Sequence, residues 1–119
     1  MERVASLEQR AREVPAGLHC DNVTVHLAGD VLGWPAEAPY DAIIVAAAAP
    51  SVPMELIEQL TPGGRMVIPV GTPFEQVLVL VMRTPDGLRA NPLGECRFVP
   101  LIGPGAWDAE AADGPLEKV

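Results

Sequence analysis

Eight residues decide the fold class of this chain: Tyr40-Asp41-Ala42-Ile43-Ile44-Val45-Ala46-Ala47. After Asp41 they form a continuous apolar run rather than an alternation of apolar and polar side chains. Such a run is typical of a strand that is covered on both faces, as in a parallel sheet. The stretch therefore predicts the central strand of an α/β domain.

The sequence after this strand predicts a helix and then a second strand. Pro50-Ser51 opens the helix, and the residues 61–64, Thr-Pro-Gly-Gly, end it. Its inward face consists of apolar residues at helical spacing, namely Val52, Leu56, Ile57 and Leu60. Residues 65–70 form another short apolar stretch, so the order matches that of parallel strands joined by helical crossovers.

The last third of the chain predicts an antiparallel ending. Residues 76–83 are strongly apolar, Pro85-Asp86-Gly87 indicates a turn, and residues 97–102 suit a further strand. These late strands have no helix between them. From residue 104 the chain is rich in Pro, Gly, Ala and acidic residues, so we expect a domain over 1–103 and a loosely held tail over 104–119.

The first third predicts a short amphipathic helix followed by a strand. Ser6-Leu7-Glu8-Gln9 fits a capping box, with Ser6 as the N-cap and Gln9 reaching back to it. The helix should span about residues 6–14, with Leu7, Ala11 and Val14 on one face and with Pro15 and Gly17 closing it. The β-branched alternation of residues 23–27 predicts a strand that ends at Gly29-Asp30, and residues 31–39 should form a loop.

The charge composition of the chain argues against some classes of binding partner. Eight basic and sixteen acidic residues leave a formal charge of −8, which opposes attraction to nucleic acid or to anionic lipid. The chain contains neither an apolar run of the roughly 18 residues that span a bilayer nor a leader pattern, so we expect a cytoplasmic protein.

Few side chains suggest a metal or catalytic cluster. Cys20 and Cys96 are isolated, so we expect no metal site and no disulfide, but two buried or half-buried thiols. His19 and His26 are expected to be surface or packed residues. Trp34 and Trp107 are expected to pack rather than to bind a ligand.

Several short motifs occur in a distinctive order and spacing. They are Asn22-Val23-Thr24-Val25, Gly29-Asp30, Tyr40–Val45, Ala47–Pro50, Val52-Pro53, Gln59-Leu60, Pro62–Arg65, Val67–Gly71 and Arg97–Leu101. Over roughly residues 1–103 the chain resembles the protein-L-isoaspartate O-methyltransferases. The resemblance implies an α/β, Rossmann-like class I methyltransferase sheet, mostly parallel with an antiparallel C-terminal hairpin.

The resemblance also implies an activity and a missing portion. Members of the family use S-adenosyl-L-methionine to methylate the carboxylate of L-isoaspartyl residues in damaged proteins, a protein-repair reaction. This chain corresponds to the third to seventh strands of their sheet, so the glycine loop and the substrate loop lie in a preceding segment. We therefore expect the truncated chain to be inactive alone. The missing strands could be supplied by a partner chain, or the remaining strands could pair directly.

The family's cofactor residues carry over to five positions. Glu2 stands where an acid binds both ribose hydroxyls, and Asp30, after Gly29, stands where an acid binds beside the adenine ring. Val31 replaces a glycine, and Ala47 lies at the cofactor-facing end of the strand, just after Ala46, which replaces a common threonine. No catalytic side chain is assigned, because an isoaspartyl carboxylate titrates near 4 and needs no general base.

Two alternatives remain open at this point. The chain could be part of a class I methyltransferase for another substrate. It could also be a degenerate methyltransferase-like module that binds a partner protein through the surface left by the missing strands.

Overall fold

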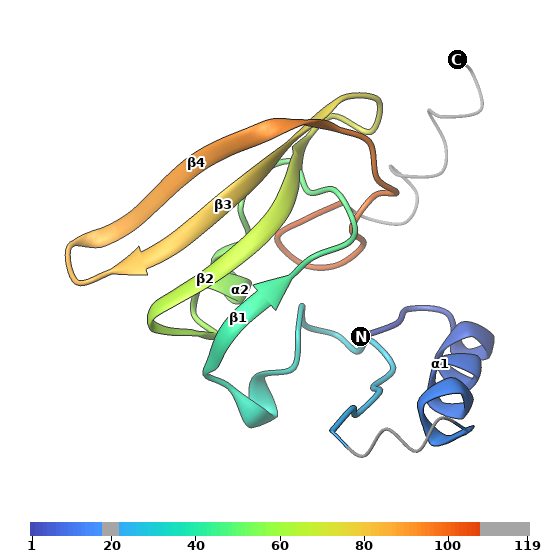
Figure 1. Cartoon of the computed structure of the whole chain (residues 1–119). Helices are drawn as coiled ribbons and strands as arrows, with labels where there is room; N and C mark the ends of the chain where they lie inside the picture. Colours follow the sequence, from blue (N-terminus) through green and yellow to red (C-terminus); the bar gives the residue numbers. More distant parts are fainter. Residues whose placement is uncertain (18–21, 108–119) are drawn as a thin grey trace.

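The computed structural model of the chain describes residues 1–17 and 22–107. Four strands form one sheet in chain order: β1 (Tyr40–Ile44), β2 (Leu60–Gly71), β3 (Gln76–Thr84) and β4 (Gly87–Cys96). β1 and β2 are parallel, whereas β2–β3 and β3–β4 are antiparallel (Figure 1). The predicted α/β sheet with an antiparallel C-terminal hairpin is therefore present.

β1 does not occupy the predicted central position. Within the described residues it pairs only with β2 and forms the edge of the sheet. Ile43 packs against the core, but Ile44 on the other face is 83% exposed. The prediction of two covered faces is wrong for this part of the chain, because the described segments cover only one side of the sheet.

The predicted helix after β1 is much shorter than expected. α2 spans only Met54–Ile57, and Leu60, expected on its inward face, begins β2 instead. The helix ends early because the Gln59 carbonyl accepts a hydrogen bond from the Tyr40 amide at 2.6 Å, which draws this backbone toward β1. The predicted loop over 31–39 contains one 3₁₀ turn, η1 (Pro35–Glu37).

The hairpin uses a different second strand from the one predicted. Thr84 pairs with Gly87 across the Pro85-Asp86 turn, so the residues immediately after the turn become β4. A strand over 97–102 is therefore wrong. The backbone there forms a single bridge with Ala48 instead. The Ala48 amide donates to the Val99 carbonyl and its carbonyl accepts from the Leu101 amide, each at 2.7 Å.

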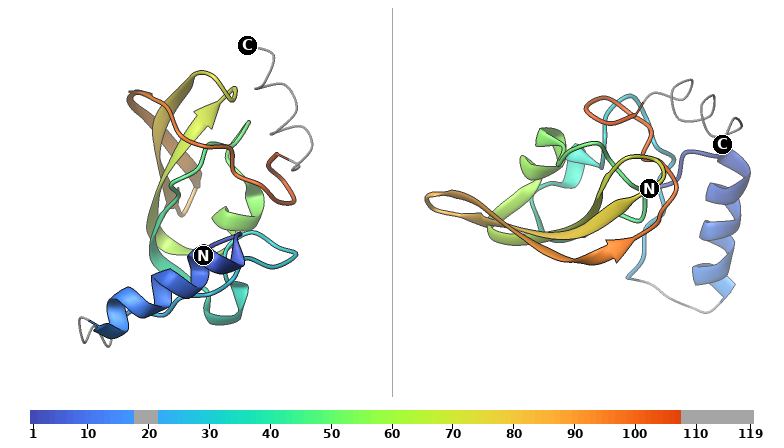
Figure 2. Two further views of the ribbon diagram at one scale, coloured as in Figure 1. Left: turned by 90° about the vertical axis from the view of Figure 1, so that its right-hand side faces the viewer. Right: turned by 90° about the horizontal axis from the view of Figure 1, so that it is seen from above.

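The N-terminal helix is present, but its predicted cap is wrong. α1 spans Ala5–Gly17, so Ser6 lies inside the helix, and the Gln9 side chain contacts Glu13 at 3.5 Å instead of reaching back. Because the helix continues through Gly17, Pro15 does not end it. Leu7 and Val14 are 48% and 61% exposed, since α1 lies beside the sheet rather than on it (Figure 2).

The predicted strand over 23–27 is reduced to one parallel bridge, between Leu27 and Glu2. Its partner in this bridge lies in the short segment before α1. The strand prediction for 23–27 is therefore wrong in extent.

The core lies on one side of the sheet, where α2 and the long loops gather (Figure 2). Its main members are Leu32, Ala49, Leu56, Ile57, Leu60, Met66, Ile68 and Val81. Across the described ranges, no helix is both long and apolar enough to cross a membrane.

Candidate functional site

Glu2 is held against the segment that leads to Gly29-Asp30. Its amide donates to the His26 carbonyl at 3.0 Å, and its carbonyl accepts from the Ala28 amide at 2.6 Å. Its Oε1 accepts from the Val4 amide at 3.1 Å. Because the Glu2–Leu27 bridge is parallel, Glu2 and Gly29-Asp30 belong to the same, carboxyl-terminal end of two neighbouring segments.

Asp30 and its neighbours form an exposed turn, and the residue that follows the turn is anchored in the core. Gly29 and Asp30 are exposed, and Val31 is 50% exposed. A Cβ placed on Gly29 would meet no atom within 4 Å, so the space beside this turn is open. The next residue, Leu32, is buried in the core and anchors the turn to the rest of the domain.

Ala47 lies at the carboxyl end of β1, next to a firmly paired dipeptide. Ala48 and Ala49 are completely buried, and Ala49 bridges to Val70 at the end of β2. Ala47 itself is half-buried, whereas Ala46 is exposed. Both follow the carboxyl end of β1, which is where open α/β sheets bind their ligands.

These placements divide the five predicted positions into two groups. The bridge brings Glu2 close to the segment that carries Gly29, Asp30 and Val31. Ala47 lies apart from this group, in the bend that follows β1. Glu2 is half-buried and Asp30 is exposed. Carboxylate oxygens accept hydrogen bonds from hydroxyl and amine donors, which the nucleoside part of the expected cofactor carries.

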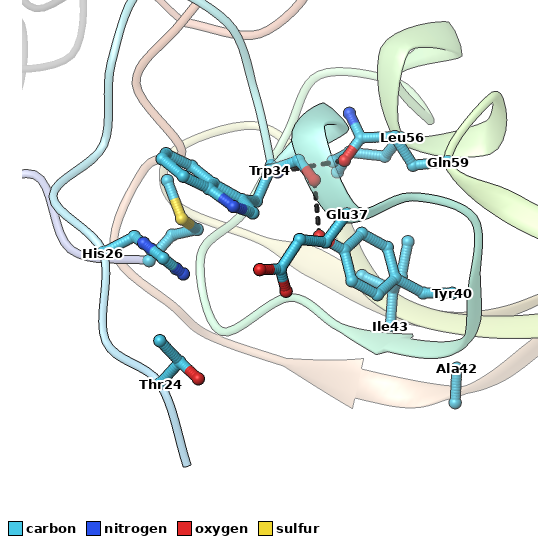
Figure 3. Close-up of a pocket in the computed structure, with 11 residues that line it drawn as sticks. Thr24, His26, Trp34, Glu37, Tyr40, Ala42, Ile43, Leu56 and Gln59 are labelled. Carbon is cyan, nitrogen blue, oxygen red and sulfur yellow. Dashed lines mark hydrogen bonds between the residues drawn. The ribbon is translucent and has the colours of Figure 1, made fainter.

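A separate cavity of about 350 Å³ lies beside β1 (Figure 3). It is lined by residues of the N-terminal segment, the 33–37 loop, β1 and the α2 region, namely Met1, Thr24, His26, Gly33, Trp34, Glu37, Tyr40, Ala42, Ile43, Leu56 and Gln59. None of the five predicted cofactor positions is among them. The cavity begins at the amino end of β1, away from Ala47, so its position differs from that of a cofactor at the carboxyl end.

Several polar side chains around the cavity form hydrogen bonds that stabilise the fold. The Tyr40 hydroxyl donates to the Trp34 carbonyl, and the Trp34 amide donates to the Gln59 side chain (Figure 3). The Gln59 side chain also donates to the Leu32 carbonyl. Burial raises the pKa of the Tyr40 phenol, and the nearby Glu37 carboxylate raises it further. Tyr40 is therefore a protonated structural donor rather than a base.

The sequence predicted only part of this arrangement. His26 and Trp34 were expected to pack, and their rings stack with centroids 3.9 Å apart at 13°. Gln59 occurs in a family motif, but no local sequence signal predicts its hydrogen bonds with Trp34, Leu32 and Glu55. Cys96 is half-buried and free, whereas His19 and Cys20 lie outside the described residues.

The comparisons with known proteins agree on one family. The family model described as protein-L-isoaspartate(D-aspartate) O-methyltransferase (PCMT) matches residues 1–105. The fold and sequence thus define a Rossmann-like methyltransferase domain, and the chain belongs to the protein-L-isoaspartate O-methyltransferase family.

Individual relatives show how much of the domain is present. The chain is 47% identical over 108 residues to the protein-L-isoaspartate O-methyltransferase of Trichlorobacter lovleyi, covering 90% of this chain and 50% of the relative. The Geobacter metallireducens enzyme is 47% identical over 112 residues, with coverages of 92% and 51%. The chain thus spans about half the length of the curated relatives that it matches.

Solved structures confirm the fold. One protein-L-isoaspartate O-methyltransferase superimposes with a TM-score of 0.78 at 26% identity, covering 88% of this chain and 34% of that chain. A Plasmodium falciparum protein described as the same methyltransferase, in complex with S-adenosyl-L-homocysteine, has a TM-score of 0.65 at 28% identity, with coverages of 87% and 51%.

Proposed function

We propose that this chain forms part of a cytoplasmic S-adenosyl-L-methionine-dependent enzyme that methylates L-isoaspartyl carboxylates in damaged proteins. The supporting observation is the family match over residues 1–105. The placement of Glu2 beside the segment leading to Asp30 is consistent with that reading.

Individual residues have limited, mainly binding roles in this proposal. Glu2 binds the ribose hydroxyls, and Asp30 accepts from the adenine amine, since carboxylate oxygens accept two such donors well. Gly29 and Val31 shape the turn around the base, and Ala47 lines the end of β1. When bound, the cofactor supplies an electrophilic methyl group, and the substrate carboxylate is already ionised at neutral pH.

The described residues do not account for a complete reaction site. The chain spans about half of its relatives' length. The family resemblance implies that the glycine loop and the substrate loop lie before the residues present here. We therefore propose that activity requires that amino-terminal portion. Holding the carboxylate in line with the methyl group supplies most of the rate acceleration in such a reaction, and this alignment depends on both halves.

The test uses a fusion and a mixture. The amino-terminal half of the Geobacter metallireducens relative is joined to residues 1–119, or added as a separate chain, and incubated with an isoaspartyl peptide and methyl-labelled cofactor. We expect labelled peptide from the fusion, none from residues 1–119 alone, and none with the matching aspartyl peptide. A folded fusion that labels neither peptide would refute the proposal.

The cofactor residues are tested in the same fusion. Asp30→Asn and Glu2→Gln should each weaken cofactor binding about 10-fold or more, because a hydrogen bond to a charged group contributes roughly 1.5–3 kcal/mol. Glu13→Gln is the matched control, since Glu13 is an exposed carboxylate of α1. Unchanged affinity in both Asp30 and Glu2 variants would contradict the assignment.

Two observations favour a second function, a partner-binding module without methyl transfer. Val31 occupies the position of a family glycine, and β1 presents an unpaired edge within the described part of the chain. Calorimetry of residues 1–119 with the separate amino-terminal half, and then with the cofactor, separates the two functions. Partner assembly without measurable cofactor binding would favour the module, whereas cofactor binding that improves in Val31→Gly would favour a weakened enzyme.

A further inference from the structure

We propose that His26 is a positioning residue for the cofactor site. Its ring stacks on Trp34 and thereby ties the segment that carries Glu2 and Asp30 to the core of the domain. The inference rests on the proposed function for the cofactor roles of these two carboxylates. The contacts that support it all lie within this chain.

The contact between His26 and Trp34 is a close stack of two planar rings. The ring centroids are 3.9 Å apart, and the ring planes differ by 13° (Figure 3). Both residues are half-buried. Planar rings stack through their faces, so another flat aromatic ring at position 26 preserves this contact, whereas an alanine removes it.

Trp34 is the fixed member of the pair. Its amide donates to Oε1 of the buried Gln59 at 3.0 Å, and its carbonyl accepts from the Tyr40 hydroxyl. Both polar groups of its backbone are therefore held by side chains, one from the connection between α2 and β2 and one from β1. The indole thus gives the imidazole of His26 a firm surface to pack against.

His26 in turn holds the backbone of Glu2. The His26 carbonyl accepts from the Glu2 amide at 3.0 Å, and the Ala28 amide donates to the Glu2 carbonyl at 2.6 Å. These two hydrogen bonds form the parallel bridge between Glu2 and Leu27. The residue that stacks on Trp34 is therefore also one of the residues that place Glu2.

Apolar packing does little to anchor the segment over residues 22–31. Three of its apolar side chains are between 44% and 51% exposed, namely Val23, Leu27 and Val31. No residue of this described range belongs to the core cluster, whose first member along the chain is Leu32. The turn that carries Asp30 is therefore flanked by two side-chain anchors, the ring of His26 before it and Leu32 after it.

Fixing the two carboxylates in advance favours cofactor binding, because less conformational freedom is then lost when the cofactor binds. Loss of the stack leaves both carboxylates present but lets their segment move relative to the core. We therefore expect cofactor binding to weaken by about 3- to 10-fold, which corresponds to the ordering of one additional side chain on binding.

The first experiment uses residues 1–119 alone and measures amide hydrogen exchange by NMR. The Ala28 amide should exchange about 10-fold faster in His26→Ala, because the bridge to Glu2 opens more often once its tie to the core is lost. The Trp34 amide should exchange at the wild-type rate, which shows that the variant is folded.

Two further variants separate the ring of His26 from other effects of substitution. His26→Phe keeps a planar ring at this position and should restore the exchange rate of the Ala28 amide. Thr24→Ala is the matched control, because Thr24 is an exposed residue of the same segment. It should leave the exchange rate unchanged.

The second experiment uses the fusion to the amino-terminal half of the Geobacter metallireducens relative and measures methyl-transfer kinetics. His26→Ala should raise the KM for the cofactor about 3- to 10-fold, and His26→Phe should restore it. The kcat and the KM for the isoaspartyl peptide should stay within about two-fold, because the stack acts on cofactor binding alone. Loss of folded enzyme would lower kcat instead.

Three results would overturn the inference. They are an unchanged Ala28 exchange rate in His26→Ala, equal defects in His26→Ala and His26→Phe, and an active fusion whose KM for the cofactor is unchanged by His26→Ala. The last result refutes the positioning role and leaves the proposed function intact. A folded wild-type fusion that neither binds the cofactor nor labels the peptide refutes both, so the two failures are distinguishable.

Discussion

Gln59 holds the backbone of Trp34 across 25 positions of sequence: its Oε1 accepts from the Trp34 amide at 3.0 Å. The Nε2 of the same side chain donates to the Leu32 carbonyl at 2.8 Å and to the Glu55 carbonyl at 2.9 Å. One buried amide group therefore fixes the loop after Asp30 to the end of α2, which sets where the candidate cofactor turn leaves the core.

Replacing Gln59 with Leu should destabilise the chain markedly. The change leaves the Trp34 amide and two carbonyl groups without this partner in a buried setting, at a cost of about 2–3 kcal/mol in the free energy of unfolding. Urea denaturation measures it. Gln9→Leu on the exposed surface of α1 is the control and should change stability by less than about 0.5 kcal/mol. Equal effects of the two changes would contradict the structural role of Gln59.

Gly33→Ala tests the same junction from the backbone side. Gly33 has a φ of +74°, and a Cβ there would collide with Oε1 of Gln59. Gly63→Ala is a matched control, because Gly63 has a similar φ of +85° but no atom lies within 4 Å of the position that its Cβ would take. Both variants incur the strain of a left-handed alanine, of order 1 kcal/mol, and Gly33→Ala should be less stable than Gly63→Ala by at least about another 1 kcal/mol. Coincident denaturation curves would show that Gln59 moves away freely.

The sheet offers a matched pair of isoleucines for testing which face is buried. Ile68 of β2 is fully buried, whereas Ile44 of β1 is 83% exposed. In the isolated chain, Ile68→Ala should reduce the free energy of unfolding by about 2–5 kcal/mol through lost burial and a cavity. Ile44→Ala should cost less than about 0.5 kcal/mol. A large cost for Ile44→Ala at low protein concentration would mean that this face is already covered.

Tyr40 should titrate above its ordinary pKa of 10.0, because burial and the Glu37 carboxylate disfavour the phenolate. It is the single tyrosine of the chain, so the tyrosinate absorbance reports this group alone. We expect a midpoint above 10 in the folded chain and near 10 in urea. A folded midpoint at or below 10 would contradict the assigned environment.

The raised pKa of Tyr40 also predicts how stability depends on pH. Its contribution is fully present below the unfolded pKa near 10 and is lost as the pH rises through the folded pKa. The midpoint temperature of thermal unfolding of the wild type should therefore fall more steeply above pH 10 than that of the Tyr40→Phe variant. At pH 7 the Phe variant should be less stable by about 1 kcal/mol, since the hydrogen bond to the Trp34 carbonyl is lost.

The amino-acid sequence alone predicted the family, the order of the main elements and the aliphatic composition of the core. These features depend on local signals: apolar periodicity, turn residues such as Pro85-Asp86-Gly87, and collinear motifs over a hundred residues. The same local signals misplaced β4 and the end of α2, because both boundaries depend on partners distant in the chain. The binding roles of Glu2 and Asp30 stay predictions.

Only the tertiary structure decided how distant segments meet. It placed Glu2 against Leu27, fixed Trp34 through Gln59, and left β1 at the edge of the described sheet with Ile44 exposed. The apolar run after Asp41 predicts a strand that is covered on both faces. Which faces and edges are covered depends on how distant segments pack and pair, and a local sequence pattern does not contain that information.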